Sequence, residues 1–258
     1  MKKIFFTICL SVILLTNCSD NSTETANANQ VKPIFSFSHN WEGSLVTSSD
    51  FNNFIFTNAN GETVSIERLR YIISDIVFTT TANEVLELDV YNLIDVTNNT
   101  NLQFEVPFTI PTGNYSNVSF TFGLDNEDNT ENYLDLNSAN FNVPDMLGGG
   151  YHYMQFDGKY LDTNNDEQPF NYHAIRAVDN PGTNPTFPQD TFFTVNLGSV
   201  NITGGTTFNI EMDIAEWFKD PHTWDLNVLN QMLMPNSMAQ DLIFQNGQSV
   251  FSLSSISQ

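Results

Sequence analysis

The stretch ETVSIERLRYIISDIVFTT, residues 62–80, decides the fold class of this chain. Branched and aromatic residues fill it, and polar residues recur between the apolar ones, as they do along a half-buried β-strand. The pair Asn60-Gly61 just before it is a turn signal of the kind that joins antiparallel strands. The stretch therefore predicts a long strand that begins after a tight turn.

Runs of the same kind recur through the rest of the chain. Turn-forming clusters separate them at intervals of roughly 10 residues, a rhythm typical of β-sandwiches and barrels. The 22 phenylalanines supply side chains for an apolar core. The strand-like runs are residues 35–39, 51–57, 85–95, 102–110, 115–125, 150–161, 169–178, 191–202 and 206–214. We therefore predict an all-β fold, a single Greek-key-like β-sandwich domain over residues 33–258.

Helical patterns are confined to the C-terminal part, from about residue 214. Residues 225–234 carry leucines at helical spacing, with an aspartate at the start that could cap a helix and a proline after the end. Residues 214–219 and 237–245 are shorter candidates. We expect these segments to form short helices appended to the sandwich.

The N-terminus has the pattern of a secretion signal. Lys2 and Lys3 precede an apolar run over residues 4–15, which is too short to span a bilayer as a helix. Cys18 stands where a lipoprotein signal peptide is cleaved. We predict that residues 1–17 are removed and that Cys18 is acylated, which would anchor the chain to a membrane. An ordinary signal peptide cleaved nearby is the alternative.

Residues 18–32 are almost purely polar and predict a disordered tether. The sequence Ser19-Asp20-Asn21 resembles the export signals of Bacteroidetes lipoproteins, which implies an outer-membrane location. The only cysteines are Cys9 and Cys18, so the exported domain is expected to have neither a disulfide nor a thiolate metal site.

Charge and motifs argue against several functional classes. The net charge of -22 and the scattered basic residues argue against nucleic-acid binding. The sequence contains no nucleophile-elbow motif and no glycine-rich phosphate loop after a strand. Distant carboxylates that meet in space could still serve glycoside hydrolysis, but we expect a protein that is not an enzyme.

A copper site is the main chemical hypothesis. His152 and Met154 alternate in one strand-like run, which predicts that both side chains project from one face. His173 lies on the next run, and His39 would join them if its strand neighbours that hairpin. Histidine nitrogen with methionine sulfur suits a soft metal such as copper. The alternative is that His152 and Met154 pack in the core and that His173 bonds a backbone carbonyl.

Five further residues with soft donor atoms lie outside that set. Met146 could reach the copper site from a loop. His222 and the methionines Met232, Met234 and Met238 form a second group, but on a helix Met232 and Met234 would not share a face. We expect core packing for these methionines.

Calcium is a separate hypothesis. The sequence DTNNDE, residues 162–167, spaces oxygen-bearing side chains as in the start of a calcium loop, and DNED, residues 125–128, has similar character. Neither has the glycine and distal glutamate of an EF-hand. Solvated hairpin tips are the alternative interpretation of both segments.

Several motifs follow one another over roughly residues 34–178. They are RLRYIISDIVF (68–78), YNLID (91–95), IPTGNYSNVSFTFGLDNEDN (110–129), MLGGGYHYMQFDGKY (146–160) and FNYHA (170–174). In this order they resemble the MbnP-like family, exported copper-binding proteins associated with methanobactin gene cassettes. The resemblance implies an all-β domain that binds copper, with Cu(I) as the expected state, through histidines, and His173 matches a ligand position.

Two departures from the family pattern bear on that site. Some members carry a tryptophan, convertible to kynurenine, in the region matching residues 146–151, and none stands here. The histidine expected after the GLD motif is replaced by Asn126 and Glu127. His152 and His39 are the candidate substitutes.

We therefore expect an exported, lipid-anchored protein that binds copper for scavenging, buffering or transfer to a partner. The alternative is a metal-free surface adhesion or glycan-associated module, which predicts an exposed aromatic patch around Trp41 or Trp224.

Overall fold

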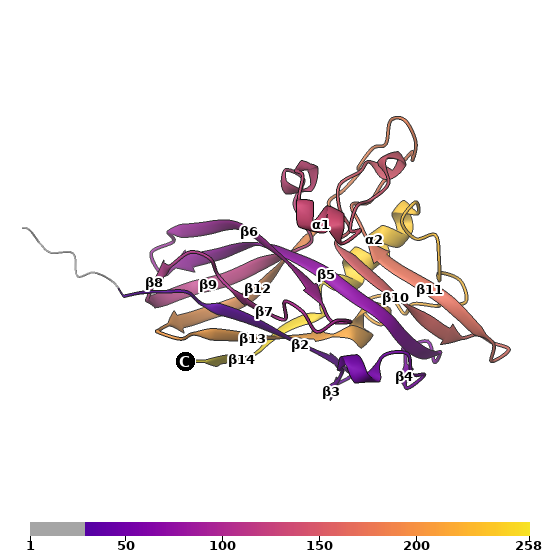
Figure 1. The fold of residues 1–258 in the computed structure, drawn as a ribbon, viewed down its shortest axis with the longest axis horizontal. Coiled ribbons are helices and arrows are strands. Elements are labelled where there is room, and N and C mark those ends of the chain that lie inside the picture. Colours follow the sequence, from indigo (N-terminus) through magenta and orange to yellow (C-terminus); the bar gives the residue numbers. More distant parts are fainter. Residues whose placement is uncertain (1–28) are drawn as a thin grey trace, which may run out of the picture.

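The computed structural model describes residues 29–258, and the chain folds as a β-sandwich with short helices (Figure 1). The prediction of an all-β sandwich is confirmed. The predicted signal peptide, Cys18 and most of the tether lie outside the described residues. Within the part that the structure describes, no helix is long and apolar enough to cross a membrane.

The larger sheet is organised by one long strand. Its seven strands are β4 (Phe56–Thr57), β5 (Thr63–Thr80), β6 (Val85–Asp95), β9 (Gly113–Phe122), β10 (Met154–Leu161), β11 (Glu167–Ala174) and β12 (Phe193–Ile202). The first half of β5 pairs with β10 and the second half with β9, while β6 runs along the opposite edge. Strand β11 extends the sheet beyond β10, so the β10–β11 hairpin forms one of its margins.

The smaller sheet closes the other side of the core. Its strands are β2 (Ile34–Trp41), β3 (Ser44–Leu45), β7 (Gln103–Glu105), β13 (Thr207–Asp213) and β14 (Phe251–Ser257). Strands β2 and β13 are parallel, although they are far apart in the sequence. Phe37 of β2 packs edge-on against Phe120 of β9, with ring centroids 5.8 Å apart. Phenylalanines from both sheets therefore meet in the interior, as the composition predicted.

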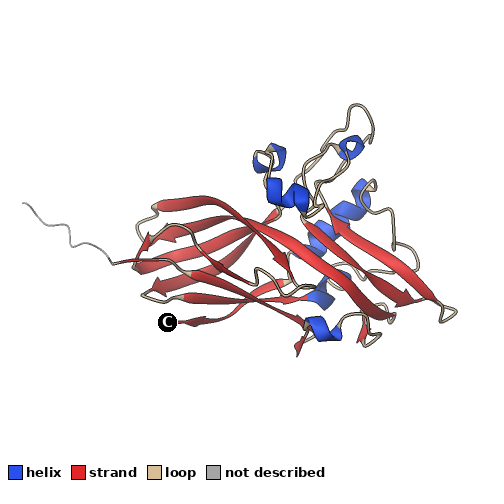
Figure 2. Ribbon diagram, viewed as in Figure 1, coloured by secondary structure: helices blue, strands red, loops and turns tan. Residues whose placement is uncertain are grey.

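Short helices gather at one end of the sandwich. They are the 3-10 helices Ser48–Asp50, Asp128–Thr130, Asp145–Leu147 and Ile214–Phe218 and the α-helices α1 (Leu134–Ser138) and α2 (Ser237–Gly247). Figure 2 shows them, in blue, around the end where the β10–β11 hairpin lies, while the C-terminus lies at the opposite end. This end carries the residues of the predicted copper site.

The predicted helix at residues 225–234 is wrong. Residues 225–229 make a single turn, and the next carbonyl groups bond elsewhere. The indole of Trp224 donates to the carbonyl of Leu229, and the backbone amide of Asn171 donates to the carbonyl of Asn230, both at 2.8 Å. These bonds occupy the carbonyl groups of Leu229 and Asn230, which would accept from later backbone amides if the helix continued. Helix α2 does form, with Asn236 as its cap, but strand β14 follows it.

Three other boundaries differ from the sequence prediction. Strand β1 (Gln30–Val31) pairs with β8 (Ile110–Pro111), so the tether ends earlier than residue 32. The side chain of Val31 packs against the core, which explains why this end of the tether is ordered. The predicted strand over residues 102–110 is split into β7 and β8, and most of residues 51–57 forms turns.

Candidate metal centre

The β10–β11 hairpin places alternate side chains on opposite faces of the larger sheet. Met154 points into the core and is fully buried. Gln155 lies opposite His173, and Asp157 lies opposite Asn171, so these four side chains share the outer face. The segment between β9 and β10 covers part of this face and brings His152 to it.

His152 precedes β10 and is held by one carbonyl group. Its backbone amide and its Nδ1 atom both lie 2.8 Å from the carbonyl oxygen of Phe141. Because a carbonyl only accepts hydrogen bonds, Nδ1 must carry the proton. The Nε2 atom is then an acceptor, and it is buried without a hydrogen-bond partner among the described residues. Burial also lowers the pKa of His152 to about 4, so the ring is neutral at pH 7.

His173 is held by a carboxylate instead. Its Nε2 atom lies 2.8 Å from Oδ1 of Asp157, which also accepts from the side chain of Asn171. The other oxygen of Asp157, Oδ2, accepts from the guanidinium of Arg68. Burial alone would raise the pKa of Asp157, but the hydrogen bonds and charge of His173, with the bonds from Asn171 and Arg68, lower it to about 2. The ionised carboxylate fixes the proton of His173 on Nε2, which leaves Nδ1 as the nitrogen available to a ligand.

The two imidazole rings are in contact. Their centroids lie 5.1 Å apart and their planes are nearly perpendicular, at 83°. Each ring has one nitrogen fixed by a carbonyl or carboxylate and the other free, which is the usual arrangement of metal-binding histidines. The unpartnered Nε2 of His152 and the neighbouring ring of His173 are donor groups of the type that a soft metal ion prefers.

The predicted common face of His152 and Met154 is wrong. His152 lies before the regular strand, so the alternation expected between these residues does not hold, and Met154 faces the core. His39 is also placed elsewhere: its Nε2 atom lies 3.1 Å from the hydroxyl of Tyr71, which is opposite Met154 in the inner layer. The sheet therefore separates Met154 and His39 from the pair formed by His152 and His173.

Other methionines lie beside the pair. A cavity of about 440 Å³ is lined by His173 together with Met146, Met232 and Met234. Met146 is 58% exposed and Met232 is 77% exposed. The expected core packing is therefore wrong for Met232 and for Met238, which is 62% exposed, while Met234 is half-buried. His222 lies apart from this cavity, with its Nε2 atom 2.7 Å from Oε1 of Gln245.

Gln240 of α2 fixes the backbone around His173. Its amide nitrogen donates to the carbonyl groups of His173, at 2.9 Å, and Leu233, at 3.1 Å. Its amide oxygen accepts from the backbone amide of Ile175, at 2.8 Å. The side chain thus replaces a neighbouring strand at the free edge of β11 and ties the methionine-bearing loop to it.

Sequence reasoning missed the residues that support the pair. Asp157 was the one with a recognisable signal, because it is an acidic residue that directly follows Phe156 in a strand-like run. The carbonyl of Phe141 and the amide of Gln240 carry no such signal, since only the tertiary fold brings them to the histidines.

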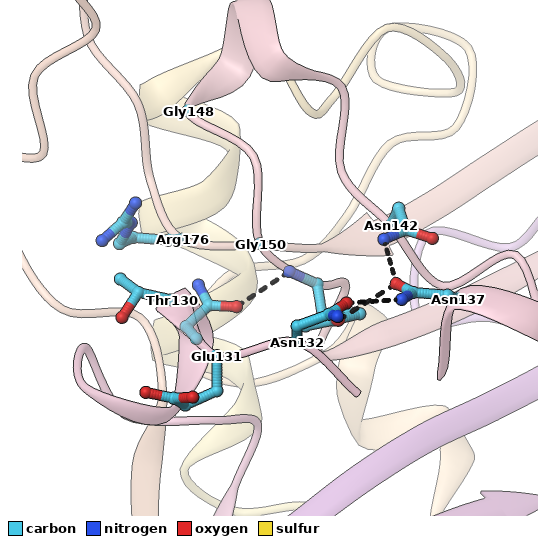
Figure 3. A pocket seen from close by; sticks show the side chains of 10 residues that line it. Thr130, Glu131, Asn132, Asn137, Asn142, Gly148, Gly150 and Arg176 are labelled. Atoms are coloured by element: carbon cyan, nitrogen blue, oxygen red, sulfur yellow. Dashed lines mark hydrogen bonds between the residues drawn. The ribbon is translucent and has the colours of Figure 1, made fainter. Parts of the chain in front are cut away.

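A second pocket, rich in asparagine, is lined in part by Tyr151, the residue before His152 (Figure 3). The side chain of Asn137 joins those of Asn132 and Asn142 at 2.7 Å each, and Oδ1 of Asn129 accepts from the amide of Tyr151 at 2.8 Å. A Cβ atom on Gly150 would lie 2.6 Å from Asn129, and the φ angle of Gly150 is +76°. The stretch that lacks the family's tryptophan is therefore closely packed glycine backbone.

The two candidate calcium segments, residues 162–167 and 125–128, have different side-chain arrangements. At the β10–β11 turn, Oδ1 of Asp162 accepts from the backbone amides of Asn164 and Asp166, at 2.8 and 3.0 Å, which fits a hairpin tip. In the other segment, Asp128 lies with Asp75 and Asp89 so that one oxygen from each falls within 4.8 Å of the others. No second feature of the described residues identifies a cation there.

The aromatic residues of the alternative hypothesis are buried. Trp41 is 5% exposed and stacks on Phe56, and Trp224 is 2% exposed. Neither side chain offers the exposed platform that a glycan-associated module would need.

Comparison with known proteins agrees with the resemblance seen in the sequence. A family model described as MbnP matches residues 30–238. Among solved structures, MbnP from Methylosinus trichosporium matches with a TM-score of 0.50 and 11% sequence identity, over 76% of this chain and 81% of that chain. A search of curated proteins gave no match. At this level of identity the structural match shows a shared fold.

Proposed function

Because the chain belongs to the MbnP family, we propose that it binds one copper ion, as Cu(I), between His152 and His173. The observation that carries the proposal is the buried, unpartnered Nε2 atom of His152, whose ring touches that of His173. A buried acceptor without a partner is costly, and a metal ion would satisfy it.

The donor set favours copper over harder metals. Imidazole nitrogens and nearby thioethers suit a soft ion, whereas calcium and magnesium require several oxygen ligands. The nearest carboxylate, Asp157, already accepts hydrogen bonds from His173, Asn171 and Arg68. It supports a ligand and is not free to act as one.

A competition titration tests the proposal. The purified protein is titrated with Cu(I) against a chelator of known affinity, and His152→Ala and His173→Ala are compared with the wild type. We expect either change to abolish tight binding. His222→Ala is the matched control, because this histidine lies outside the site. Unchanged affinity in the double variant His152→Ala, His173→Ala would exclude the site.

We further propose that the protein acts in the cell envelope without catalysing a reaction, as a copper scavenger, buffer or donor. The support is the N-terminal sequence, with Cys18 as the acylated residue and the outer membrane as the proposed location. Cells grown with a labelled fatty acid should incorporate the label into the wild type and not into Cys18→Ser. Equal labelling of both proteins would refute acylation at this residue.

A further inference from the structure

The cavity beside His173 has an unusual lining. Three methionines, Met146, Met232 and Met234, share it with one face of His173, and its remaining walls are largely leucine and proline. The seven methionines of the chain also include Met154 and Met212, which are fully buried. Met154 and Met212 thus pack in the core, the three methionines of the cavity gather at the proposed copper site, and Met238 is exposed outside the cavity.

Packing does not account for the exposed methionines. Met146 and Met232 leave 58% and 77% of their surface exposed, so neither gains much from burial of apolar surface. Met232 also has a φ angle of +57°, in the left-handed region that residues with a side chain rarely adopt. Such strain persists only where the surrounding structure maintains it, and it is concentrated at functional sites.

Both loops that carry the methionines are fixed to the domain. The carbonyl of Met146 accepts from the amide of Gly182 at 2.7 Å, in the loop between β11 and β12. Leu233, between the other two methionines, is buried and is bonded through its carbonyl to Gln240, which also bonds His173. Hydrogen bonds therefore fix the backbone of both methionine-bearing loops, and Gln240 links one of these loops to His173.

We propose that Met146, Met232 and Met234 form a thioether face that completes the coordination of Cu(I) held by His152 and His173. This inference rests on the proposed function, because it assigns further ligands to the same site. Methionine sulfur is a soft, uncharged donor, and its unbranched side chain reaches a bound ion without rearrangement of the backbone. The two histidines supply nitrogen, and at least one of the three methionines supplies sulfur.

Methionine methyl resonances give a direct test. The protein is labelled with ¹³C at the methionine methyl groups and titrated with one equivalent of Ag(I), a redox-inert probe of the same charge as Cu(I). We expect a resonance of Met146, Met232 or Met234 to shift, while those of Met154 and Met238 stay in place. Met238 is a suitable control because it is 62% exposed and does not line the cavity.

Affinity provides the second measurement. The variant Met146→Leu, Met232→Leu, Met234→Leu retains apolar side chains of similar size and is expected to unfold at the same temperature as the wild type. Its Cu(I) affinity should fall at least tenfold, and that of Met238→Leu should not change. Wild-type affinity in the triple variant, with the loss on histidine substitution intact, would overturn the thioether face alone. A wild type that does not bind Cu(I) would overturn the proposed function as well.

Discussion

At the scale of single residues, Asp157 determines which nitrogen of His173 carries the proton in the proposed site. Its carboxylate fixes the proton of His173 on Nε2 and is itself fixed by Asn171 and Arg68. Groups of this kind orient a ligand and raise its basicity, and their loss commonly lowers metal affinity about 10–100-fold. The free nitrogen of His173 is thus dependent on a residue that would not touch the ion.

Asp157→Asn is expected to weaken Cu(I) binding about 10–100-fold while the protein stays folded. The amide keeps the size of the carboxylate but lacks its charge, so His173 loses the group that holds its tautomer. A competition titration with a Cu(I) chelator measures the effect. Glu167→Gln on the same hairpin removes an exposed carboxylate and should leave affinity unchanged. An equal loss of Cu(I) affinity in both variants would show that the negative charge of the hairpin matters, and not the hydrogen bond to His173.

At the scale of elements, a bulge in β5 determines which residues reach the outer face. Asp157 pairs with Arg68, and Gly158 pairs with Ile66, so Glu67 is an extra residue on β5. Leu69 and Ile66 both face the core although they lie three apart, and the bulge makes this possible. Arg68 can then meet Asp157 on the outer face.

Gly158→Ala should destabilise the sandwich at this bulge. A Cβ atom on Gly158 would lie 2.1 Å from the carbonyl oxygen of Ser65 and 2.7 Å from the ring of Phe170. Because one of these atoms belongs to the backbone, the strands must separate, at a cost of about 2 kcal/mol or more. Chemical denaturation measures the free energy of unfolding. Gly204→Ala is the control, since nothing lies within 4 Å of its Cβ position and its φ is not left-handed. Equal stability of both variants would contradict a tight fit.

The elements also show how far the sequence determines the fold. The runs at residues 62–80 and 85–95 located β5 and β6 almost to the residue, because branched and aromatic residues fill them and turn-forming residues flank them. Sequence patterns failed where tertiary bonds override local preference. The spacing of Leu226, Leu229 and Leu233 indicated a helix, yet Trp224 and β11 take the carbonyl groups that a helix needs.

The same limit applies to the candidate site. The proximity of His152 and His173 followed from a hairpin that the sequence indicates clearly. Alternation wrongly added Met154, because the regular strand begins only at Met154 and His152 lies in the loop before it. The expected helix also separated Met232 from Met234, whereas the observed loop brings both to one cavity. Strand pairing was predictable, but the course of the loops around it was not.

At the scale of the whole molecule, the dominant feature is a net charge of -22. Part of it is concentrated where β5, β6 and the segment after β9 meet, at Asp75, Asp89 and Asp128. Burial, together with the charges of Asp128 and other nearby acids, raises the pKa of Asp75 to about 6. A folded-state pKa above the ordinary value for aspartate means that ionisation of Asp75 opposes folding.

The free energy of unfolding should therefore carry a contribution from Asp75 that falls as pH rises from about 4 to about 6 and stays low above that. The buried histidines contribute with the opposite sign, since burial lowers the pKa of His39 and His152 to about 4. Their contribution is lost as pH falls from about 6.5 to about 4. The two effects overlap in the wild type, so only a variant isolates Asp75.

Asp75→Asn should raise the free energy of unfolding at pH 7 by about 1 kcal/mol, after allowance for the solvent screening of a partly exposed group. Asparagine keeps the acceptor for the Ser74 hydroxyl and tolerates the φ angle of +48° at this position. The gain should shrink toward zero as pH falls from about 6 to about 4, because the wild-type carboxyl becomes protonated. Denaturation curves of both proteins at several pH values measure the difference, in which the histidine contributions cancel. A difference that does not change with pH would show that ionisation of Asp75 does not destabilise the fold.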